Sequence, residues 1–205
     1  MPDRKFEVLN FRDAEHPDTR FQAEPGNEYS EAQPGFIEDF GVMVELLSSQ
    51  LTSQINKAVE LYYRLIVVVV PPDGRQTINF RACAERLDSR YININLELSR
   101  RLLELTQRQR SLQVQRLLKD IIGNTNNRVV FLDNLEILFD VSLKLDPLKC
   151  LQGLARNRTI VAVWNGSFEN NYLIYAEPSH PEYRRYLKSD FLVVSPGKAE
   201  GDSSQ

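Results

Sequence analysis

The sequence predicts an α/β protein with a mainly parallel sheet of about five strands, flanked by helices. Short apolar runs at residues 65–70, 129–132, 159–164 and 191–194 alternate with stretches whose apolar residues recur at helical spacing. The run at 65–70, LIVVVV, contains no polar position, which is typical of a strand buried on both faces of a parallel sheet. The helical stretches between these runs supply the crossover connections that parallel strands require.

The other elements follow in chain order. Residues 36–63 are expected to form one long helix, or two helices with a break at residues 48–53, where Ser and Thr offer an N-cap. Further helices are expected at residues 77–90, 96–105, 112–122, 147–156 and 181–187, with a short helix or turn at 135–139. Short strands are expected at residues 91–94 and 172–175. No internal repeat is visible in the chain.

Composition and patterning divide the chain into three parts. Residues 1–35 are polar and interrupted by proline and glycine, so we expect a flexible arm. Residues 36–195 are expected to form the α/β domain, in which residues 36–64 are a helical lead-in. Residues 196–205 are expected to form a disordered tail.

Bulk properties exclude several classes of function. Of the 205 residues, 42% are hydrophobic and 26% are charged, and the net charge of −3 gives no overall attraction to nucleic acid or anionic membranes. No apolar signal segment opens the chain, and the longest apolar run is too short to span a bilayer, so we expect a cytoplasmic protein. Two cysteines without a Cys/His cluster predict reduced thiols and no structural zinc site.

A strand, a loop and a helix, followed downstream by a strand that ends in Asp, is the layout of a P-loop nucleotide-binding core. Here the strand at 65–70 runs into VPPDGRQT at residues 70–77. Compared with G-x-x-x-x-G-K-[ST], Val70 and Arg75 stand at the glycine positions and Gln76 at the lysine position, and only Thr77 keeps its type. An ordinary turn between a strand and a helix is the alternative interpretation.

The loop still offers candidates for contacts to ATP, because a helix N-terminus attracts anions. The candidate nucleotide-binding residues are Pro72, Asp73, Gly74, Arg75, Gln76, Thr77 and Asn165. Thr77 and Asp133 are the candidates for holding Mg²⁺.

Three polar residues follow the second and third long strands. Asp133 stands where a P-loop ATPase holds Mg²⁺, although a helix N-cap over residues 135–139 is an equally good interpretation. Many ATPases of this kind use a Glu directly after this Asp to activate water. Here Asn134 stands at that position, so Glu136, two residues further on, is the candidate. Asn165 is placed to sense a γ-phosphate, and the alternative is an Asn-Gly turn pair.

The segment at residues 96–122 is rich in arginine. Its candidates for contacts to DNA phosphates are Arg100, Arg101, Arg108 and Arg110. A solvated helix face is the alternative interpretation of these residues.

Long runs of this chain, YININLELSRRLLELTQRQRSLQVQRLL and VVFLDNLEILFDVSLKLDPLKCLQGLARNRTIVAVWNGSFENNYLIYAEPSHPEYRRY, resemble the BrxF family, the small P-loop subunit of type 3 BREX phage-defence systems. The resemblance covers roughly residues 61–194 and places the family's Walker A loop on residues 70–77 and its Walker B Asp on Asp133. It implies a bacterial, cytoplasmic defence component that acts with a methyltransferase, a large phosphatase-like protein and a helicase.

These observations together favour a P-loop-fold subunit that binds nucleotide weakly and acts as a scaffold or regulator, a pseudo-ATPase. The first alternative is an active AAA-like ATPase switch that uses ATP and Mg²⁺, either within a homo-oligomer or with other subunits. The second alternative is a DNA-binding accessory protein of replication or recombination.

Overall fold

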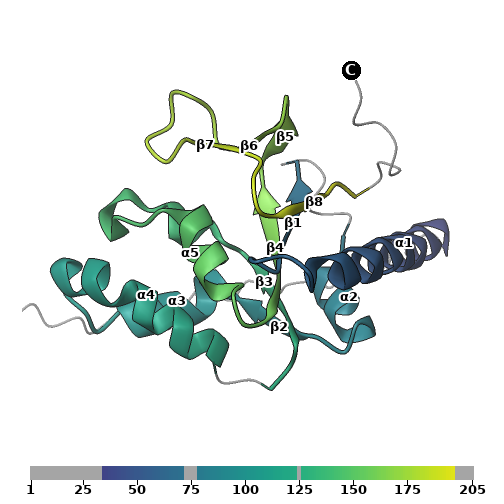
Figure 1. Cartoon of the computed structure of the whole chain (residues 1–205), viewed down its shortest axis with the longest axis horizontal. Coiled ribbons are helices and arrows are strands. Elements are labelled where there is room, and N and C mark those ends of the chain that lie inside the picture. The colour runs from purple at the N-terminus through teal and green to yellow at the C-terminus, as the bar shows by residue number, and fades with distance from the viewer. Residues whose placement is uncertain (1–33, 72–77, 124–125, 197–205) are drawn as a thin grey trace, which may run out of the picture. The chain divides into compact units, whose positions relative to one another are not determined.

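The computed structural model describes residues 34–71, 78–123 and 126–196 (Figure 1). Of the arm expected at residues 1–35, residues 1–33 lie outside the described residues, whereas Pro34 and Gly35 already belong to a helix. Most of the expected tail, from residue 197, also lies outside them. The helices are α1 (Pro34–Ala58), α2 (Phe80–Arg86), α3 (Ile94–Leu102), α4 (Gln107–Gly123) and α5 (Pro147–Leu154), with 3-10 helices η2 (Glu136–Phe139) and η3 (Val141–Leu143). The strands are β1 (Leu65–Val70), β2 (Arg90–Asn93), β3 (Val129–Asp133), β4 (Thr159–Asn165), β5 (Ser167–Glu169), β6 (Tyr172–Tyr175), β7 (Arg184–Leu187) and β8 (Leu192–Val194).

Five strands form the main sheet in the order β2-β3-β4-β1-β8, and every neighbouring pair is parallel. This confirms the α/β class with a five-stranded parallel sheet, and the architecture is consistent with a P-loop NTPase-like fold. The register aligns Val70 of β1 with Asn165 of β4, and Asn93 of β2 with Asp133 of β3. Polar residues at the ends of separate strands are thereby brought to one edge.

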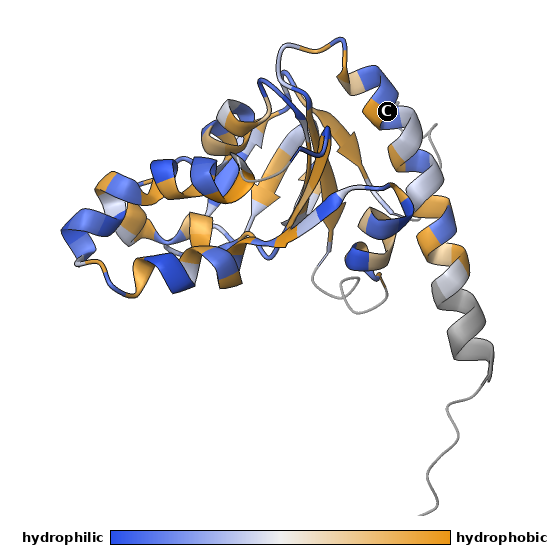
Figure 2. Cartoon of the chain, turned by 90° about the horizontal axis from the view of Figure 1, so that it is seen from below, coloured by the Kyte–Doolittle hydropathy of each residue, from blue (hydrophilic) through white to orange (hydrophobic). Residues whose placement is uncertain are grey.

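Helices cover both faces of this sheet because β1 and β4 are apolar on both faces (Figure 2). Leu65, Val67 and Val69 pack in one hydrophobic cluster with α3, α4 and α5. Ile66 and Val68 point the other way and pack with α1 and α2. All six side chains of β1 are buried, which is why a run without polar positions was a sound signal for a central strand.

The second sheet is small and antiparallel, in the order β5-β6-β7. It follows β4 after a single residue, Gly166, and lies beyond the carboxyl end of β4 (Figure 1). The indole N–H of Trp164 donates to the carbonyl oxygen of Ile174 at 2.9 Å, which ties the two sheets together. Phe139 of η2 stacks on Tyr175 of β6, with ring centroids 3.5 Å apart.

The structure contradicts one expected helix and decides between two alternatives for another. Residues 181–187 were expected to form a helix, but Arg184–Leu187 is strand β7, whose side chains alternate between half-buried and exposed because Tyr186 packs near Trp164. Of the two alternatives for residues 36–63, one long helix is confirmed, since α1 runs unbroken through residues 48–53 and ends at Ala58. The hydroxyl of Thr52 donates to the carbonyl of Ser48 at 2.8 Å, so it bonds back within the helix instead of capping a new one.

No helix among the described residues combines the length and the apolar character needed to cross a membrane. The long helix α1 is instead amphipathic: its buried apolar residues, such as Leu47 and Leu51, are separated by exposed polar ones.

Gly166→Ala should destabilise the fold. A Cβ at this position would lie far inside van der Waals contact of the Ile174 carbonyl oxygen and close to the indole nitrogen of Trp164. We expect the free energy of unfolding to fall by about 1–3 kcal/mol, measured by urea denaturation.

Gly153→Ala is the matched control, because Gly153 lies in α5 and nothing lies within 4 Å of an added Cβ. That substitution should raise the free energy of unfolding by roughly 0.5–1 kcal/mol, the usual advantage of alanine over glycine in a helix. An equal response at the two glycines would contradict the tight contact between the sheets.

Candidate functional site

The carboxyl ends of β1, β4 and β3 lie side by side, because β4 stands between the other two strands. β1 ends at Val70 beside Asn165, the last residue of β4, and β3 ends at Asp133. The N–H of Gly166, the residue after β4, donates to the carbonyl of Val70 at 2.9 Å, so the chain that leaves β4 is fixed against the end of β1. Ligands of parallel α/β sheets bind at this edge.

The expected phosphate-binding segment follows β1 directly. Its candidates, Pro72, Asp73, Gly74, Arg75, Gln76 and Thr77, lie outside the described residues. The described chain resumes at residue 78, and α2 begins with Asn79 as N-cap, whose side-chain oxygen accepts from the N–H of Ala82 at 3.0 Å. Helix α2 therefore starts three residues later than the sequence pattern predicts.

Asp133 is a buried carboxylate, with only 6% of the residue exposed. Its Oδ2 accepts the hydroxyl of Tyr91 at 2.8 Å, and its Oδ1 accepts the N–H of Asn134 at 2.7 Å. Asn134 adopts a left-handed conformation with φ of 55°, which turns the chain sharply after the strand. The N-cap interpretation of Asp133 is wrong, because Leu135 precedes η2 and no side chain caps it.

Glu136 lies between two amide side chains that come from distant parts of the sequence. Its Oε2 accepts the Nδ2 of Asn95 at 2.9 Å, and its Oε1 accepts the Nδ2 of Asn165. Asn95 also accepts the N–H of Ile137 through its Oδ1 at 2.8 Å and donates its own N–H to the carbonyl of Asn134. These bonds fix the start of η2 against α3 and the end of β4. We call Asn95, Glu136 and Asn165 the amide clamp.

The structure thus brings Glu136 and Asn165 together, as expected for residues at neighbouring strand ends. The Oδ1 of Asn165 is buried and accepts no hydrogen bond within the part of the chain that the structure describes. A buried acceptor without a donor costs free energy, so this oxygen is suited to accept a bond from a bound molecule or water.

Two residues of the site escaped sequence analysis, Tyr91 and Asn95. Both lie about forty positions before their partners, Asp133 and Glu136, and neither belongs to a motif. The available signal for Asn95 was positional, because it directly follows the strand expected at residues 91–94. Tyr91 begins that strand, and no signal pointed to it.

A tyrosine near the amide clamp has a raised pKa. Burial, together with the nearby carboxylates of Glu182 and Glu136, raises the pKa of Tyr175 to about 12. The ring of Tyr175 stacks on Phe139, three residues after Glu136 in η2. A neutral tyrosine therefore lies near the clamped carboxylate across the whole physiological pH range.

The site offers few ligands for a metal ion. Within residues 34–71, 78–123 and 126–196, no three side chains of His, Cys, Asp or Glu gather as a metal site. Mg²⁺ is commonly held by one or two carboxylates together with the phosphates of a nucleotide. Asp133 could hold Mg²⁺ in that way. The described residues do not form a site in which protein side chains alone would hold a metal ion.

The arginines considered for DNA contact have different surroundings. Arg110 donates from Nε to the carbonyls of Leu102 and Leu105, at 3.0 and 2.9 Å, so it fixes the turn after α3. Arg100 lies 3.6 Å from Glu97 in an exposed pair. Arg101 and Arg108 lie in the same pair of helices, and DNA contact by these arginines stays a prediction.

Comparison with protein-family models and with curated proteins finds no match to this chain.

Tyr91→Phe should weaken the fold, because it removes the hydroxyl that donates to the buried carboxylate of Asp133. We expect the free energy of unfolding to fall by about 1–3 kcal/mol, the usual cost of a lost bond to a buried charged group. Urea denaturation measures this change. Tyr62→Phe is the control, since that residue is 69% exposed, and an equally large loss there would show that the Asp133 bond is not the cause.

Stability should fall in alkaline solution as Tyr175 ionises. The pKa of this group is raised from 10.0 to about 12 in the folded chain, so folding favours the neutral hydroxyl. Its contribution is fully present below about pH 10 and is lost as the pH rises toward about 12. Tyr175→Phe should make the unfolding free energy less dependent on pH between about pH 10 and about pH 12, measured by urea denaturation at a series of pH values.

Proposed function

We propose that this chain is a P-loop-fold subunit of a bacterial, cytoplasmic phage-defence assembly of the BREX type, in which it binds nucleotide weakly and acts as a scaffold or regulator. The observation that supports nucleotide binding is the placement of polar residues at adjacent strand ends. Asp133 ends β3, and Asn165, which is bonded to Glu136, ends the neighbouring strand β4 beside the end of β1. The assignment to a BREX assembly rests on the resemblance of residues 61–194 to the BrxF family. The partners implied are the methyltransferase, phosphatase-like and helicase subunits.

The strand order supports a nucleotide site. Ligands of open α/β sheets bind outside the carboxyl ends of the strands, so polar residues at neighbouring strand ends can contact one ligand. Here β4, which ends in Asn165, separates β1 from β3, which ends in Asp133. Asp133 and Thr77 would hold Mg²⁺, which neutralises charge on the phosphates of a bound nucleotide.

Two observations favour a scaffold over an active ATPase. The loop at residues 70–77 has Gln76 in place of the lysine that neutralises phosphate charge. Its two prolines carry no backbone N–H, and its aspartate adds negative charge beside the phosphates. Both carboxylate oxygens of Glu136 already accept amide N–H groups in the clamp. A base that activates water needs an oxygen directed at that water, and these bonds compete for it.

An active ATPase switch is the second candidate, because the same clamp contains the carboxylate of Glu136, which could activate water. Release of Glu136 from Asn165 on nucleotide binding would free an oxygen and leave the amide to contact phosphate. Turnover of ATP therefore separates the two candidates.

Calorimetric titration with Mg-ATP tests the proposal. We expect weak binding, with a dissociation constant above about 100 μM, or about −5.5 kcal/mol, and loss of that binding in Asp133→Asn. This substitution keeps the side-chain shape and removes the charge that holds Mg²⁺. Asp120→Asn is the matched control, since Asp120 is an exposed residue of α4.

ATP turnover by the wild-type protein should stay at the background rate and should not change in Glu136→Gln. Turnover that stops in Glu136→Gln would replace the scaffold proposal with the ATPase switch. A scaffold should also form a complex of discrete mass with a co-expressed BREX subunit, measured by light scattering after gel filtration, without any added nucleotide.

A further inference from the structure

The two helical layers that cover the main sheet differ in charge. Residues 94–123 and 144–158, which include α3, α4 and α5, contain ten Lys or Arg against four Asp or Glu. The cations are Arg100, Arg101, Arg108, Arg110, Arg116, Lys119, Lys144, Lys149, Arg156 and Arg158, and the acids are Glu97, Glu104, Asp120 and Asp146. Residues 41–60 and 80–90, which include most of α1 and all of α2, are balanced, with four of each sign. The chain as a whole is acidic, so the positive layer is a local feature of the fold.

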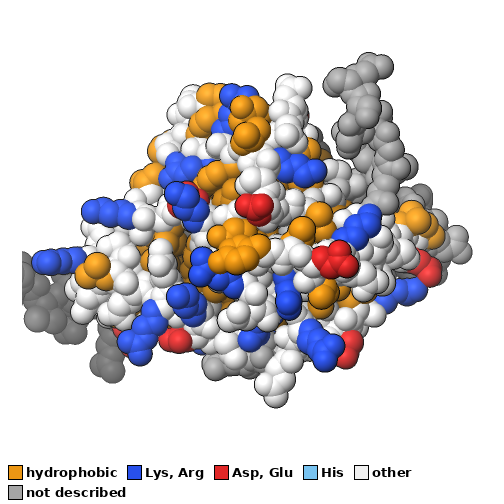
Figure 3. Space-filling model, in the orientation of Figure 1, with side chains coloured by type: hydrophobic (Ala, Val, Ile, Leu, Met, Phe, Trp, Pro, Cys, Tyr) orange, Lys and Arg blue, Asp and Glu red, His pale blue; other side chains and the backbone are white. Residues whose placement is uncertain are grey.

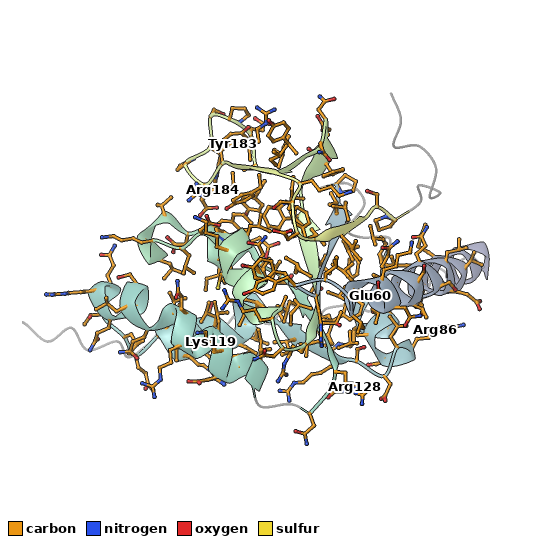
Figure 4. The ribbon with its side chains drawn as sticks, viewed as in Figure 1. Glu60, Arg86, Lys119, Arg128, Tyr183 and Arg184 are labelled. Atoms are coloured by element: carbon orange, nitrogen blue, oxygen red, sulfur yellow. The ribbon has the colours of Figure 1, made fainter. Side chains whose placement is uncertain are left out.

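This layer presents its cations on one side of the molecule. Blue side chains are spread over α3, α4 and α5 with few red ones between them (Figure 3). Lys119 of α4 and Arg86 of α2 lie on the two opposite layers (Figure 4). The positive charge therefore faces away from the α1–α2 side of the sheet.

Some cations of the layer are already engaged in the fold. Arg110 holds the turn after α3, and Arg158 donates to the carbonyl of Ile122 at the end of α4, at 2.8 Å. The pairs Arg116–Asp120 and Lys149–Asp146 are exposed and long, at 3.9 and 3.7 Å. Such pairs are weak, so Arg116 and Lys149 can easily leave their carboxylates to bind another anion.

The remaining cations of interest are Arg108, Lys119 and Lys144, which are exposed and form no ion pair with any carboxylate in the described part of the chain. Arg108, Arg116 and Lys119 are spaced by eight and three residues, which places them along one stripe of α4 with exposed Leu112 between them. We call these three residues the α4 stripe.

We propose that the α4 stripe, together with Lys144, binds the phosphate backbone of duplex nucleic acid without reading its sequence. Arg108 and Lys119 are separated by about 16 Å along the helix axis, from the rise of 1.5 Å per residue. One strand of a duplex places about five phosphates in that length. A row of flexible cations on a straight helix suits such a regularly charged backbone, because contacts to phosphate carry no base specificity.

The composition of the layer favours a duplex over a single strand. Residues 94–123 and 144–158 contain no Phe, Tyr or Trp. Binding of single strands relies on aromatic side chains that stack on unpaired bases. The layer therefore offers cations but no aromatic side chains. A duplex presents a higher density of phosphate charge than a single strand, so it suits this layer better.

Fluorescence anisotropy with a labelled duplex DNA of about 24 base pairs, in the absence of nucleotide, tests this site directly. The full chain should bind at about 50 mM salt, and affinity should fall steeply as salt is raised, because each phosphate contact contributes about 0.9 to the slope of log affinity against log salt. The triple variant Arg108→Gln, Arg116→Gln, Lys119→Gln should bind at least tenfold more weakly. Its slope should be smaller by about 2–3. A single strand of the same length should bind more weakly than the duplex.

The matched control removes three cations that lie outside the positive layer, in α1, α2 and β2. It is the variant Lys57→Gln, Arg86→Gln, Arg90→Gln, so that both variants carry the same net charge. Equal loss of binding in the two variants would overturn the proposal, because net charge alone would then explain it. Failure of the wild-type chain to bind duplex at about 50 mM salt would also overturn it.

Exposed Leu112 and Leu103, each 74% exposed, make an acidic protein surface the competing partner for this layer. Soluble poly-glutamate serves as the probe for that alternative. If poly-glutamate bound to the α4 stripe while duplex DNA did not, the site would belong to an acidic protein and not to nucleic acid. None of these measurements involves ATP, so their outcome is independent of the proposed nucleotide site.

Discussion

Burial of β1 and β4 on both faces is the constraint on which the other features of this fold depend. A strand with apolar side chains on each face needs a helical layer on each side, and α1–α2 and α3–α5 provide the two layers. Polar side chains then have no place in the middle of the sheet and emerge only where strands end. Asp133 and Asn165 are the last residues of their strands, so the same packing that forms the core also gathers the polar site.

Much of the fold was predictable because its signals are local. Continuous apolar runs identified β1, β3 and β4 within about one residue of their observed bounds. Strand β7 was not predictable from its own residues, since Arg184 to Leu187 carry no apolar alternation and become a strand only by pairing with β6. The site divides in the same way: Asp133, Glu136 and Asn165 follow recognisable strands, whereas Asn95 enters through a bond across about forty residues.

The polar and aromatic parts of the site hold η2 from two directions. On one side, Asn95 and Asn165 donate to the carboxylate of Glu136. On the other, Phe139 stacks on Tyr175 and meets Trp164 edge-on, with centroids 5.0 Å apart. A short 3-10 helix has little stability of its own, so these tertiary contacts determine where the carboxylate lies. Such an arrangement suits a site whose geometry is set before a ligand arrives, and the hydrogen bonds to Glu136 are the part that a ligand could exchange.

Trp164 gives this protein a built-in optical reporter. It is the single tryptophan of the chain, it is 1% exposed, and it directly precedes Asn165. Its indole contacts the small sheet through Ile174 and lies near the rings of Phe139, Tyr175 and Tyr186. Emission from this one fluorophore therefore reports on the junction between the two sheets, next to the amide clamp, with no background from other indoles and no label to attach.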